Sequence, residues 1–283
     1  MAITRSGFLP LGEAGSNRYN QQYAQKGAAF SLPSWVSGQR LMVVTPELLS
    51  AFPILKPLPR PVLTSLAEKS ALKKFARRGV VLSAGEREDV VCFLFEGRLQ
   101  GVDFTIDGRE VGLYFIEPGD FCGELGLFDE GPQPEYVIAL TATVVVFVPT
   151  QALREIMLKT PGVINVLGMK LASRVRQMTY QRSLLGLPNI AQRVCCQLWL
   201  LLPDIDKAAV DNIKESLVKS SLITNPPTHM EIAIMLNVSR ETVTRVFQSL
   251  QNRQIVKRDG PTRLLINDLK ALKQFADGSD ELG

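Results

Sequence analysis

The chain has 283 residues, 46% of them hydrophobic, and its formal net charge is +4 with a pI near 8.9. This length predicts about two domains, and the mild charge permits a nucleic-acid partner without requiring one. No apolar run reaches the roughly 18 residues of a membrane span, and the start, MAITRSGFLPLGEAG, lacks a secretory signal pattern. We therefore expect a cytoplasmic protein with no membrane partner.

The first 61 residues are predicted to be a flexible, Pro-rich N-terminal extension. Residues 1 to about 45 are rich in Gly, Ser, Asn and Gln, a composition typical of flexible arms. A proline-dense stretch follows, and prolines at this density break helices and stiffen a linker. Its prolines are Pro46, Pro53, Pro57, Pro59 and Pro61. The first ordered helix is expected at residues 62–70.

Residues 62–160 carry the pattern of a small all-β domain. Short runs of β-branched and aromatic residues alternate with glycine-containing turns. The pair Asp107-Gly108 lies between two such runs, as in a β-hairpin. Many short strands at near-regular spacing predict a small barrel or jelly roll.

The four cysteines and the single histidine offer little for metal or catalytic chemistry. Cys92, Cys122, Cys195 and Cys196 form no C-x-x-C pair, and His229 stands alone. Zinc and iron–sulfur sites need more ligands in tighter clusters, so we expect buried thiols and no metal. Since no acid–base constellation is present, the sequence predicts that the protein is not an enzyme.

A long helix is predicted over residues 161–187. One row of its side chains has heptad spacing, and a second row fills the alternating position of an a/d stripe. The rows are Ile164, Leu171, Met178 and Leu185, and then Leu167, Arg174 and Gln181. The pattern favours a dimerisation helix, and a helix packed on its own domain is the alternative. Polar residues in the seam would fix register or line a ligand site.

Residues 188–283 are predicted to form a DNA-binding domain. The segment Gly186-Leu187-Pro188-Asn189 ends the long helix like a hinge, and residues 190–202 form an apolar helix. In residues 226–260, Thr228 and Glu231 have capping-box spacing. Asn237 suits a positive φ at a sharp turn, and Ser239 caps the next helix. These signals predict a helix-turn-helix.

The second helix of this motif exposes polar side chains at its N-terminal end, the end that enters the major groove. Arginine can pair with guanine there, and glutamate can accept from cytosine. The outward residues are Arg240, Glu241, Thr244, Arg245 and Gln248. The hydroxyls of Ser239 and Thr242 can contact phosphates. The next segment, IVKRDGPTRLLI, is predicted to be a hairpin wing that brings Lys257, Arg258 and Arg263 near the DNA backbone.

The stretch from about residue 62 to 276 resembles the CRP/FNR family of bacterial transcription regulators. The strongest matches are PGDFCGELGLFDEG and VSRETVTRV, separated by the long helix. The resemblance implies an α+β fold: a cyclic-nucleotide-binding-type β-roll (jelly roll) at 62–160, a dimerisation helix at 161–187, and a winged helix-turn-helix at 188–283. It also implies a homodimer and RNA polymerase as a partner.

The family's DNA-contacting positions can be carried over residue by residue. Arg240, Glu241 and Arg245 match base-reading residues, in the SRETVxR spacing of members that bind TGTGA-type half-sites of a DNA palindrome. Thr228, Ser239 and Thr242 match phosphate-contacting positions. His229 stands where an arginine often sits, so one backbone contact would be weaker.

The effector pocket departs from the family pattern. Gly123, Glu124 and Leu125 match the turn whose glutamate binds a ribose hydroxyl in cyclic-AMP-binding members. Pro134-Glu135 replaces an Arg-Ser pair, and a carboxylate would repel the cyclic phosphate. Cyclic AMP is therefore disfavoured as the effector. The remaining pocket candidates, on the long helix, are Met178, Thr179 and Arg182.

The nature of the effector stays open at this level. The pocket turn is either purely structural or binds another metabolite, or a larger anion such as cyclic di-GMP binds elsewhere. The arginines available for anion contacts are Arg60, Arg77, Arg78, Arg87 and Arg109. No cofactor is assigned. The competing function is an effector-binding adaptor that controls a partner regulator.

Overall fold

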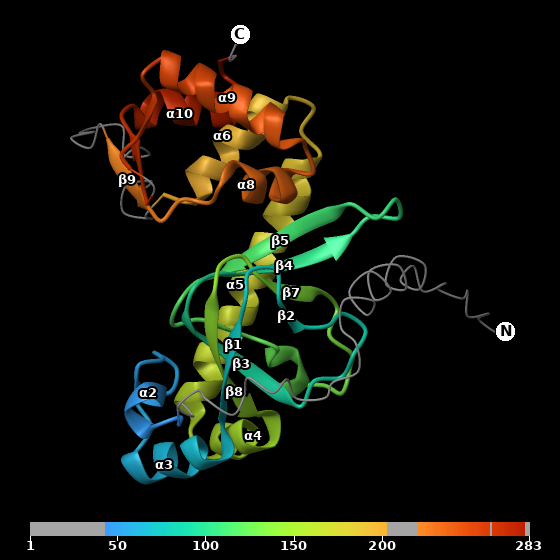
Figure 1. Cartoon of the computed structure of the whole chain (residues 1–283), viewed down its shortest axis with the longest axis vertical. Coiled ribbons are helices and arrows are strands. Elements are labelled where there is room, and N and C mark those ends of the chain that lie inside the picture. The colour runs from blue at the N-terminus through green and yellow to red at the C-terminus, as the bar shows by residue number, and fades with distance from the viewer. Residues whose placement is uncertain (1–42, 203–219, 261, 281–283) are drawn as a thin grey trace, which may run out of the picture. The chain divides into compact units, whose positions relative to one another are not determined.

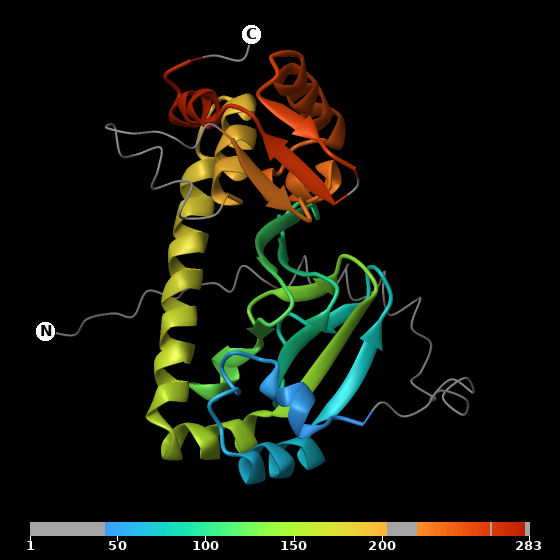
Figure 2. The same ribbon diagram turned by 90° about the vertical axis from the view of Figure 1, so that its left-hand side faces the viewer.

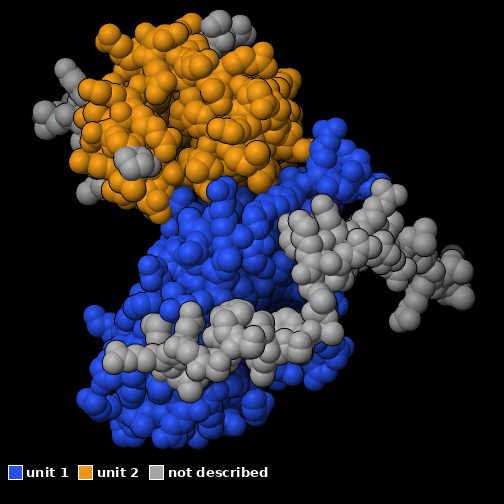
Figure 3. Space-filling view, viewed as in Figure 1, with its two compact units in different colours: residues 1–174 blue, residues 175–283 orange. Residues whose placement is uncertain are grey.

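The computed structural model describes residues 43–202, 220–260 and 262–280. These residues form two compact units, one ending at Arg174 and one beginning at Val175 (Figure 3). The sequence places its flexible arm mostly in residues 1–42, which lie outside the described residues.

Two antiparallel sheets of four strands each form the body of the first unit (Figures 1 and 2). The first sheet has the order β1 (Ala71–Phe75), β8 (Thr143–Pro149), β3 (Val90–Glu96) and β6 (Phe121–Cys122). The second has the order β2 (Val80–Leu82), β7 (Tyr136–Ala139), β4 (Leu99–Phe104) and β5 (Glu110–Ile116). The architecture is the β-roll expected from the sequence.

The side chains of β3 alternate between two hydrophobic cores, one on each face of the strand. Cys92 and Leu94 point between the two sheets, whereas Val91 and Phe93 point to the opposite face, where helices cover the sheet. Successive strand residues face opposite sides, so the unbroken apolar run from Val91 to Leu94 is consistent with burial on both faces.

The predicted hairpin at Asp107-Gly108 is confirmed. It joins β4 to β5, and the Thr105 amide donates to the Arg109 carbonyl at 3.0 Å. Gly108 has a φ of 82°, a conformation that glycine adopts without a Cβ clash.

The proline-dense stretch is not the linker that the sequence suggested. It contains α2 (Pro46–Ser50), and α3 (Arg60–Lys69) begins within it. Leu49, Phe52 and Leu55 are buried in the core that also contains β3 and α4 (Thr150–Lys159). Prolines are tolerated at the first turn of a helix, where the backbone N–H has no partner in any case. The apolar residues between the prolines therefore anchor this stretch to the β-roll.

The long helix α5 (Pro161–Leu185) forms where the sequence predicts it. The two rows of the predicted stripe differ in exposure. Ile164 and Met178 are 43% and 45% exposed, but Leu167, Arg174 and Gln181 are buried against the chain itself. The second row therefore packs within the protomer. For these positions the helix behaves as one packed on its own chain, which is the alternative to a dimer seam.

The second unit is a small helical domain with a three-stranded sheet. Beyond the end of α5, its described helices are α6 (Ile190–Leu200), α8 (His229–Leu236), α9 (Arg240–Asn252) and α10 (Leu269–Asp277). Its sheet has the order β10 (Val256–Arg258), β11 (Arg263–Ile266) and β9 (Ser221–Thr224). The wing hairpin is β10 and β11, whereas β9 and α10 have no counterpart among the predicted elements. Within the described part of the chain, no helix is long and apolar enough to cross a membrane.

Candidate nucleic-acid interface and effector site

The starts of both helices of the helix-turn-helix and the end of its first helix lie at the residues that the sequence signals. The Thr228 hydroxyl accepts from the Glu231 amide at 3.3 Å, and the Glu231 carboxylate accepts from the Thr228 amide at 2.9 Å. Asn237 ends α8 with a φ of 51°. The Ser239 hydroxyl caps α9 by accepting from the Thr242 amide at 3.1 Å. Local hydrogen bonds thus set the start of α9.

The exposed face of α9 carries the residues predicted to contact bases. Arg240, Glu241 and Arg245 are all exposed, while Val243 and Phe247 on the opposite face are buried. Hydrogen bonds from its own backbone and from Ser239 lower the pKa of Glu241, and the guanidiniums of Arg240 and Arg245 add to this shift. Glu241 is therefore a carboxylate at neutral pH, with both oxygens available as hydrogen-bond acceptors.

His229 joins the two helices of the motif. Its Nδ1 lies 3.0 Å from the Thr244 hydroxyl, and its ring lies 4.4 Å from the Phe247 ring, centroid to centroid. The predicted phosphate-contacting residues Thr228, Ser239 and Thr242 lie at the N-termini of α8 and α9. In the wing, Arg263 pairs with Asp259 at 3.4 Å.

A second candidate site lies inside the β-roll, at the turn after β6. Gly123 has a φ of 81°, and a Cβ built there would lie 3.0 Å from the Val90 carbonyl oxygen. Glycine is therefore required for the chain to enter the 3-10 turn η2 (Glu124–Leu127). This turn directs the Glu124 side chain inward, where the residue is 1% exposed.

Arg174 of α5 is the counterion of Glu124. Its Nη1 lies 2.6 Å from Glu124 Oε1, and its Nη2 donates to the Phe121 carbonyl. The guanidinium also lies over the Tyr114 ring at 4.5 Å from the centroid. Burial raises the pKa of the Glu124 carboxyl, and the Arg174 charge opposes that shift. The pair thus offsets part of the cost of burying two charges.

Glu135 completes this polar cluster. Its carboxylate accepts hydrogen bonds from the Tyr114 hydroxyl and, at 3.0 Å, from the Gln133 side-chain amide. Burial raises the pKa of Glu135, and the hydrogen bond from Tyr114 opposes the shift. The cluster therefore holds two carboxylates and one guanidinium in a place where water is excluded.

The structure brings only part of the predicted effector residues together. Glu124 and Glu135 share the buried cluster, whereas Leu125, Met178, Thr179 and Arg182 are exposed. Tyr114 and Arg174 are the functional candidates that the effector prediction did not contain. The sequence does carry a signal for Arg174, because a charged residue in the apolar register of the long helix is typical of a ligand site or of register control.

Three of the arginines proposed as anion contacts are paired with carboxylates. Arg60 pairs with Glu47 at 2.8 Å, Arg109 with Asp107 at 2.9 Å, and Arg78 with Glu110. Arg87 lines a groove of about 450 Å³ that also contains four acidic residues. Those residues are Glu88, Asp89, Asp129 and Glu130. Arg77 is exposed. Four of these five arginines thus have carboxylates close by.

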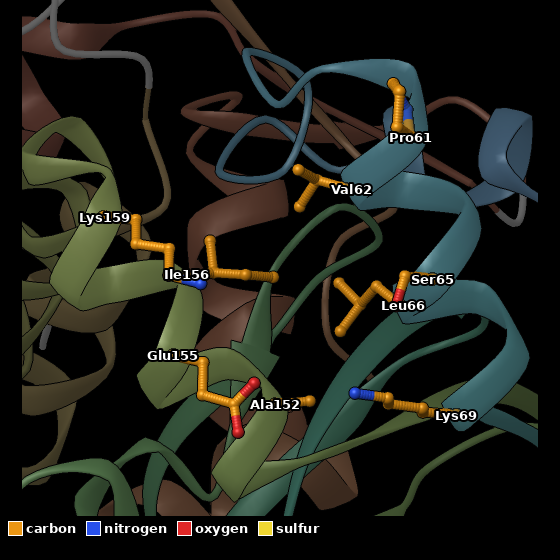
Figure 4. A pocket seen from close by; sticks show the side chains of 9 residues that line it. All are labelled: Pro61, Val62, Ser65, Leu66, Lys69, Ala152, Glu155, Ile156 and Lys159. Atoms are coloured by element: carbon orange, nitrogen blue, oxygen red, sulfur yellow. The ribbon is translucent and has the colours of Figure 1, made fainter.

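Another surface groove, of about 290 Å³, lies between α3 and α4 (Figure 4). Val62 and Leu66 line it from α3, and Ile156 from α4, with Lys69 and Lys159 among its polar residues. None of the predicted site residues lines this groove. The described residues contain no group of three or more His, Cys, Asp or Glu side chains suited to a metal ion. The four cysteines are free and buried, as expected.

Comparison with known families gives two matches along the chain. Residues 72–160 match a model described as a cyclic nucleotide-binding domain, and residues 192–275 match one described as a Crp-like helix-turn-helix domain. The two matches coincide with the β-roll and with the second unit.

Individual relatives agree with these matches. The chain is 24% identical over 192 residues to the cAMP-activated global transcriptional regulator CRP of Pasteurella multocida, which covers 68% of this chain and 88% of that protein. It is 27% identical over 197 residues to the cAMP-activated global transcriptional regulator Vfr of Pseudomonas aeruginosa, with the same coverage of 68% and 88%. A solved structure of a CooA mutant from Carboxydothermus hydrogenoformans has the same fold, with a TM-score of 0.61 at 18% identity over 84% of this chain and 98% of that one.

Proposed function

This chain belongs to the CRP/FNR family of DNA-binding transcription regulators, and we propose that it acts as a homodimer on a palindromic site with TGTGA-type half-sites. The observation that supports this most directly is the exposed N-terminal end of α9. There the Ser239 cap leaves Arg240, Glu241 and Arg245 free to enter a major groove.

Each of these side chains has a distinct role in the proposal. The guanidiniums of Arg240 and Arg245 pair with guanine O6 and N7, and the Glu241 carboxylate accepts from cytosine N4. The hydroxyls of Thr228, Ser239 and Thr242 contact phosphates and fix the register of the motif on the duplex.

The exposed row of α5 supports the dimer. Ile164, Val175 and Met178 are 43%, 64% and 45% exposed, and with Gly168 and Leu171 they recur at intervals of three and four residues. An apolar stripe with this spacing is suited to a second helix of the same kind. A symmetric dimer would place two copies of α9 about 34 Å apart, which is one turn of DNA.

We further propose that the regulator responds to a small-molecule effector other than cyclic AMP. Glu124 and Glu135 lie in one buried cluster with a single guanidinium, so a phosphate placed there would meet two carboxylates. Loss of a charge-assisted phosphate contact costs about 1.5–3 kcal/mol even before this repulsion is counted. RNA polymerase is the expected protein partner, and the cytoplasm is the expected location because the DNA is there.

The test is a binding titration of the full chain with a labelled palindrome and with a scrambled duplex of equal length. A dissociation constant at least about 1,000-fold lower for the palindrome at the same salt concentration is expected. Equal and strongly salt-dependent binding of both duplexes would contradict sequence-specific recognition.

Sedimentation of the wild type and of a Val175→Glu, Met178→Glu double variant tests the dimer. The wild type is expected to sediment as a dimer and the variant as a monomer. A matched Arg176→Glu variant, which changes an exposed residue outside this row, is expected to stay dimeric. Calorimetric titration with cyclic AMP and cyclic di-GMP then tests the effector, and saturable binding of cyclic AMP would contradict the proposal.

A further inference from the structure

The single histidine of the chain occupies an unusual position in the helix-turn-helix. His229 is the first residue of α8, it is half-buried, and its ring packs on Phe247 of α9. Its Nδ1 contacts the hydroxyl of Thr244, which lies one helical turn after the base-reading candidate Arg240. His229 therefore borders the surface that carries the candidate DNA contacts.

The hydrogen bonds of Thr244 determine the tautomer of His229. The Thr244 hydroxyl donates its proton to the Arg240 carbonyl oxygen at 2.9 Å. Its oxygen is then the acceptor for His229, so Nδ1 carries a hydrogen and donates across the 3.0 Å contact. In the neutral ring, Nε2 is left without a hydrogen and is the atom that can gain a proton.

Burial and two guanidiniums act on this imidazole. Burial lowers the pKa of His229, and the guanidiniums of Arg258 on β10 and Arg240 on α9 lower it further. The neighbouring carboxylate on α8, Glu231, is held on the Thr228 amide at 2.9 Å. In the absence of DNA, the ring is consequently neutral at pH 7.

We propose that His229 takes up a proton when the helix-turn-helix binds DNA, and that its Nε2–H then donates a hydrogen bond to a phosphate oxygen. The inference rests on the proposed DNA binding. A nearby phosphate favours the imidazolium, and it also compensates the charges of Arg240 and Arg258 that oppose protonation in the free protein. The proton comes from solvent, and no covalent bond of the protein changes.

The proposal fixes the sign of a pH effect. The DNA-bound form has the higher His229 pKa, so the extra affinity is present at low pH and is lost as the pH rises through the pKa of the bound form. Each unit by which DNA raises this pKa corresponds to about a tenfold difference in Kd. Below the pKa of the free protein both forms are protonated, and the gain reaches its limit.

The experiment is a titration of the full chain with the specific palindrome between pH 6 and pH 8 at constant ionic strength. Wild-type Kd is expected to fall about tenfold from pH 8 to pH 6. One additional phosphate contact would also steepen the dependence of log Kd on log salt concentration by about 0.9 at the lower pH. A Kd that is the same at both pH values would overturn the proposal.

Two variants assign the effect to this residue. His229→Gln keeps a side-chain donor for Thr244 but cannot be protonated, so its Kd is expected to be independent of pH and to match that of the wild type at pH 8. His229→Arg has a permanent charge and is expected to bind with a pH-independent Kd as low as that of the wild type at pH 6. Unchanged melting temperatures of both variants exclude a folding defect. A pH dependence that persists in His229→Gln would assign the proton to another group.

Proton NMR gives a direct measurement, because a chain with one histidine has one imidazole Hε1 resonance per protomer of a symmetric dimer. Titration of this resonance is expected to give a higher pKa with the palindrome than without it. Equal values in the two states would overturn the proposal while leaving specific DNA binding intact. Absence of specific binding at every pH would instead refute the proposed function on which the inference rests.

Discussion

The helix-turn-helix and the polar cluster of the β-roll assemble their side chains in different ways. Arg240, Glu241 and Arg245 lie within six positions of one helix, and a cap at Ser239 sets where that helix begins. Tyr114 and Arg174, by contrast, are separated by 60 positions and meet because β5 and the part of α5 that ends at Arg174 belong to one folded unit. The first arrangement depends on local geometry, and the second depends on sheet topology.

The same contrast applies to the charges. The charged groups of α9 are exposed, so water solvates them and their removal should affect DNA binding more than folding. Arg174 and Glu124 are buried, so removal of one leaves the other charge without compensation. Mutations in the two regions should therefore separate a binding phenotype from a folding phenotype.

The largest effect is expected for Arg174→Ala. Loss of the guanidinium leaves Glu124 buried and unpaired, which should lower the free energy of unfolding by about 3–5 kcal/mol. Urea unfolding followed by circular dichroism measures the change. Arg176→Ala, an exposed arginine on the same helix, is the control and should change stability by less than about 0.5 kcal/mol. If Arg174→Ala lowers the free energy of unfolding no more than Arg176→Ala does, the buried ion pair does not stabilise the fold, and the proposed contrast with the exposed charges of α9 is wrong.

Arg240→Ala is expected to act on binding alone. Loss of a bidentate contact with guanine should cost about 1–3 kcal/mol, or about 5- to 150-fold in Kd for the palindrome. The unfolding free energy should stay unchanged. Lys270→Ala removes an exposed positive charge from α10 and controls for charge alone. Full discrimination against a scrambled duplex in Arg240→Ala would refute the base-reading assignment.

Thr228→Ala tests the local region at a smaller scale. The hydroxyl caps α8, and loss of such a cap costs typically about 1 kcal/mol of stability. Thr179→Ala is the matched control, because that hydroxyl only donates to the Val175 carbonyl within its own helix. Thermal melting of both variants measures the difference, and equal melting temperatures would show that the capping box does not stabilise the domain.

The smallest effect is a pH dependence in the β-roll. Burial raises the pKa of Glu135 above its usual 4.5, so the folded state disfavours the ionised form. Stability of the wild type is therefore expected to fall as pH rises from about 4.5 through the folded-state pKa. Glu135→Gln lacks this ionisation and should become the more stable protein as pH increases. Glu130→Gln, at an exposed position, should follow the wild type. Parallel pH profiles for the wild type and Glu135→Gln would contradict the assignment.

Predictions from sequence succeeded where short-range hydrogen bonds decide the structure. The capping box at Thr228, the positive φ of Asn237 and the turn at Gly108 each depend on neighbouring residues. The proline-dense stretch was misinterpreted because composition indicated a linker, whereas Leu49 and Phe52 are buried in the core of the β-roll. Burial of that kind depends on a surface contributed by distant strands, and composition does not contain this information.

The effector site was predicted in part for the same reason. Glu124 was identified because Gly123-Glu124-Leu125 resembles the pocket turn of the family, and such a short motif is a local feature of the sequence. Tyr114 was missed because an aromatic residue in a strand with alternating burial gives no sign that its hydroxyl meets a buried carboxylate.

The sequence by itself determined the order of β-roll, long helix and helix-turn-helix, the capped starts of α8 and α9, and the polar face of α9. Those features follow from spacing and capping within about ten residues, where backbone geometry fixes which side chains share a face. Only the tertiary structure decided that Arg174 pairs with Glu124, that Glu135 bonds to Tyr114, and that His229 contacts Thr244. Each of these contacts joins side chains from different elements, and such meetings are set by how sheets and helices pack.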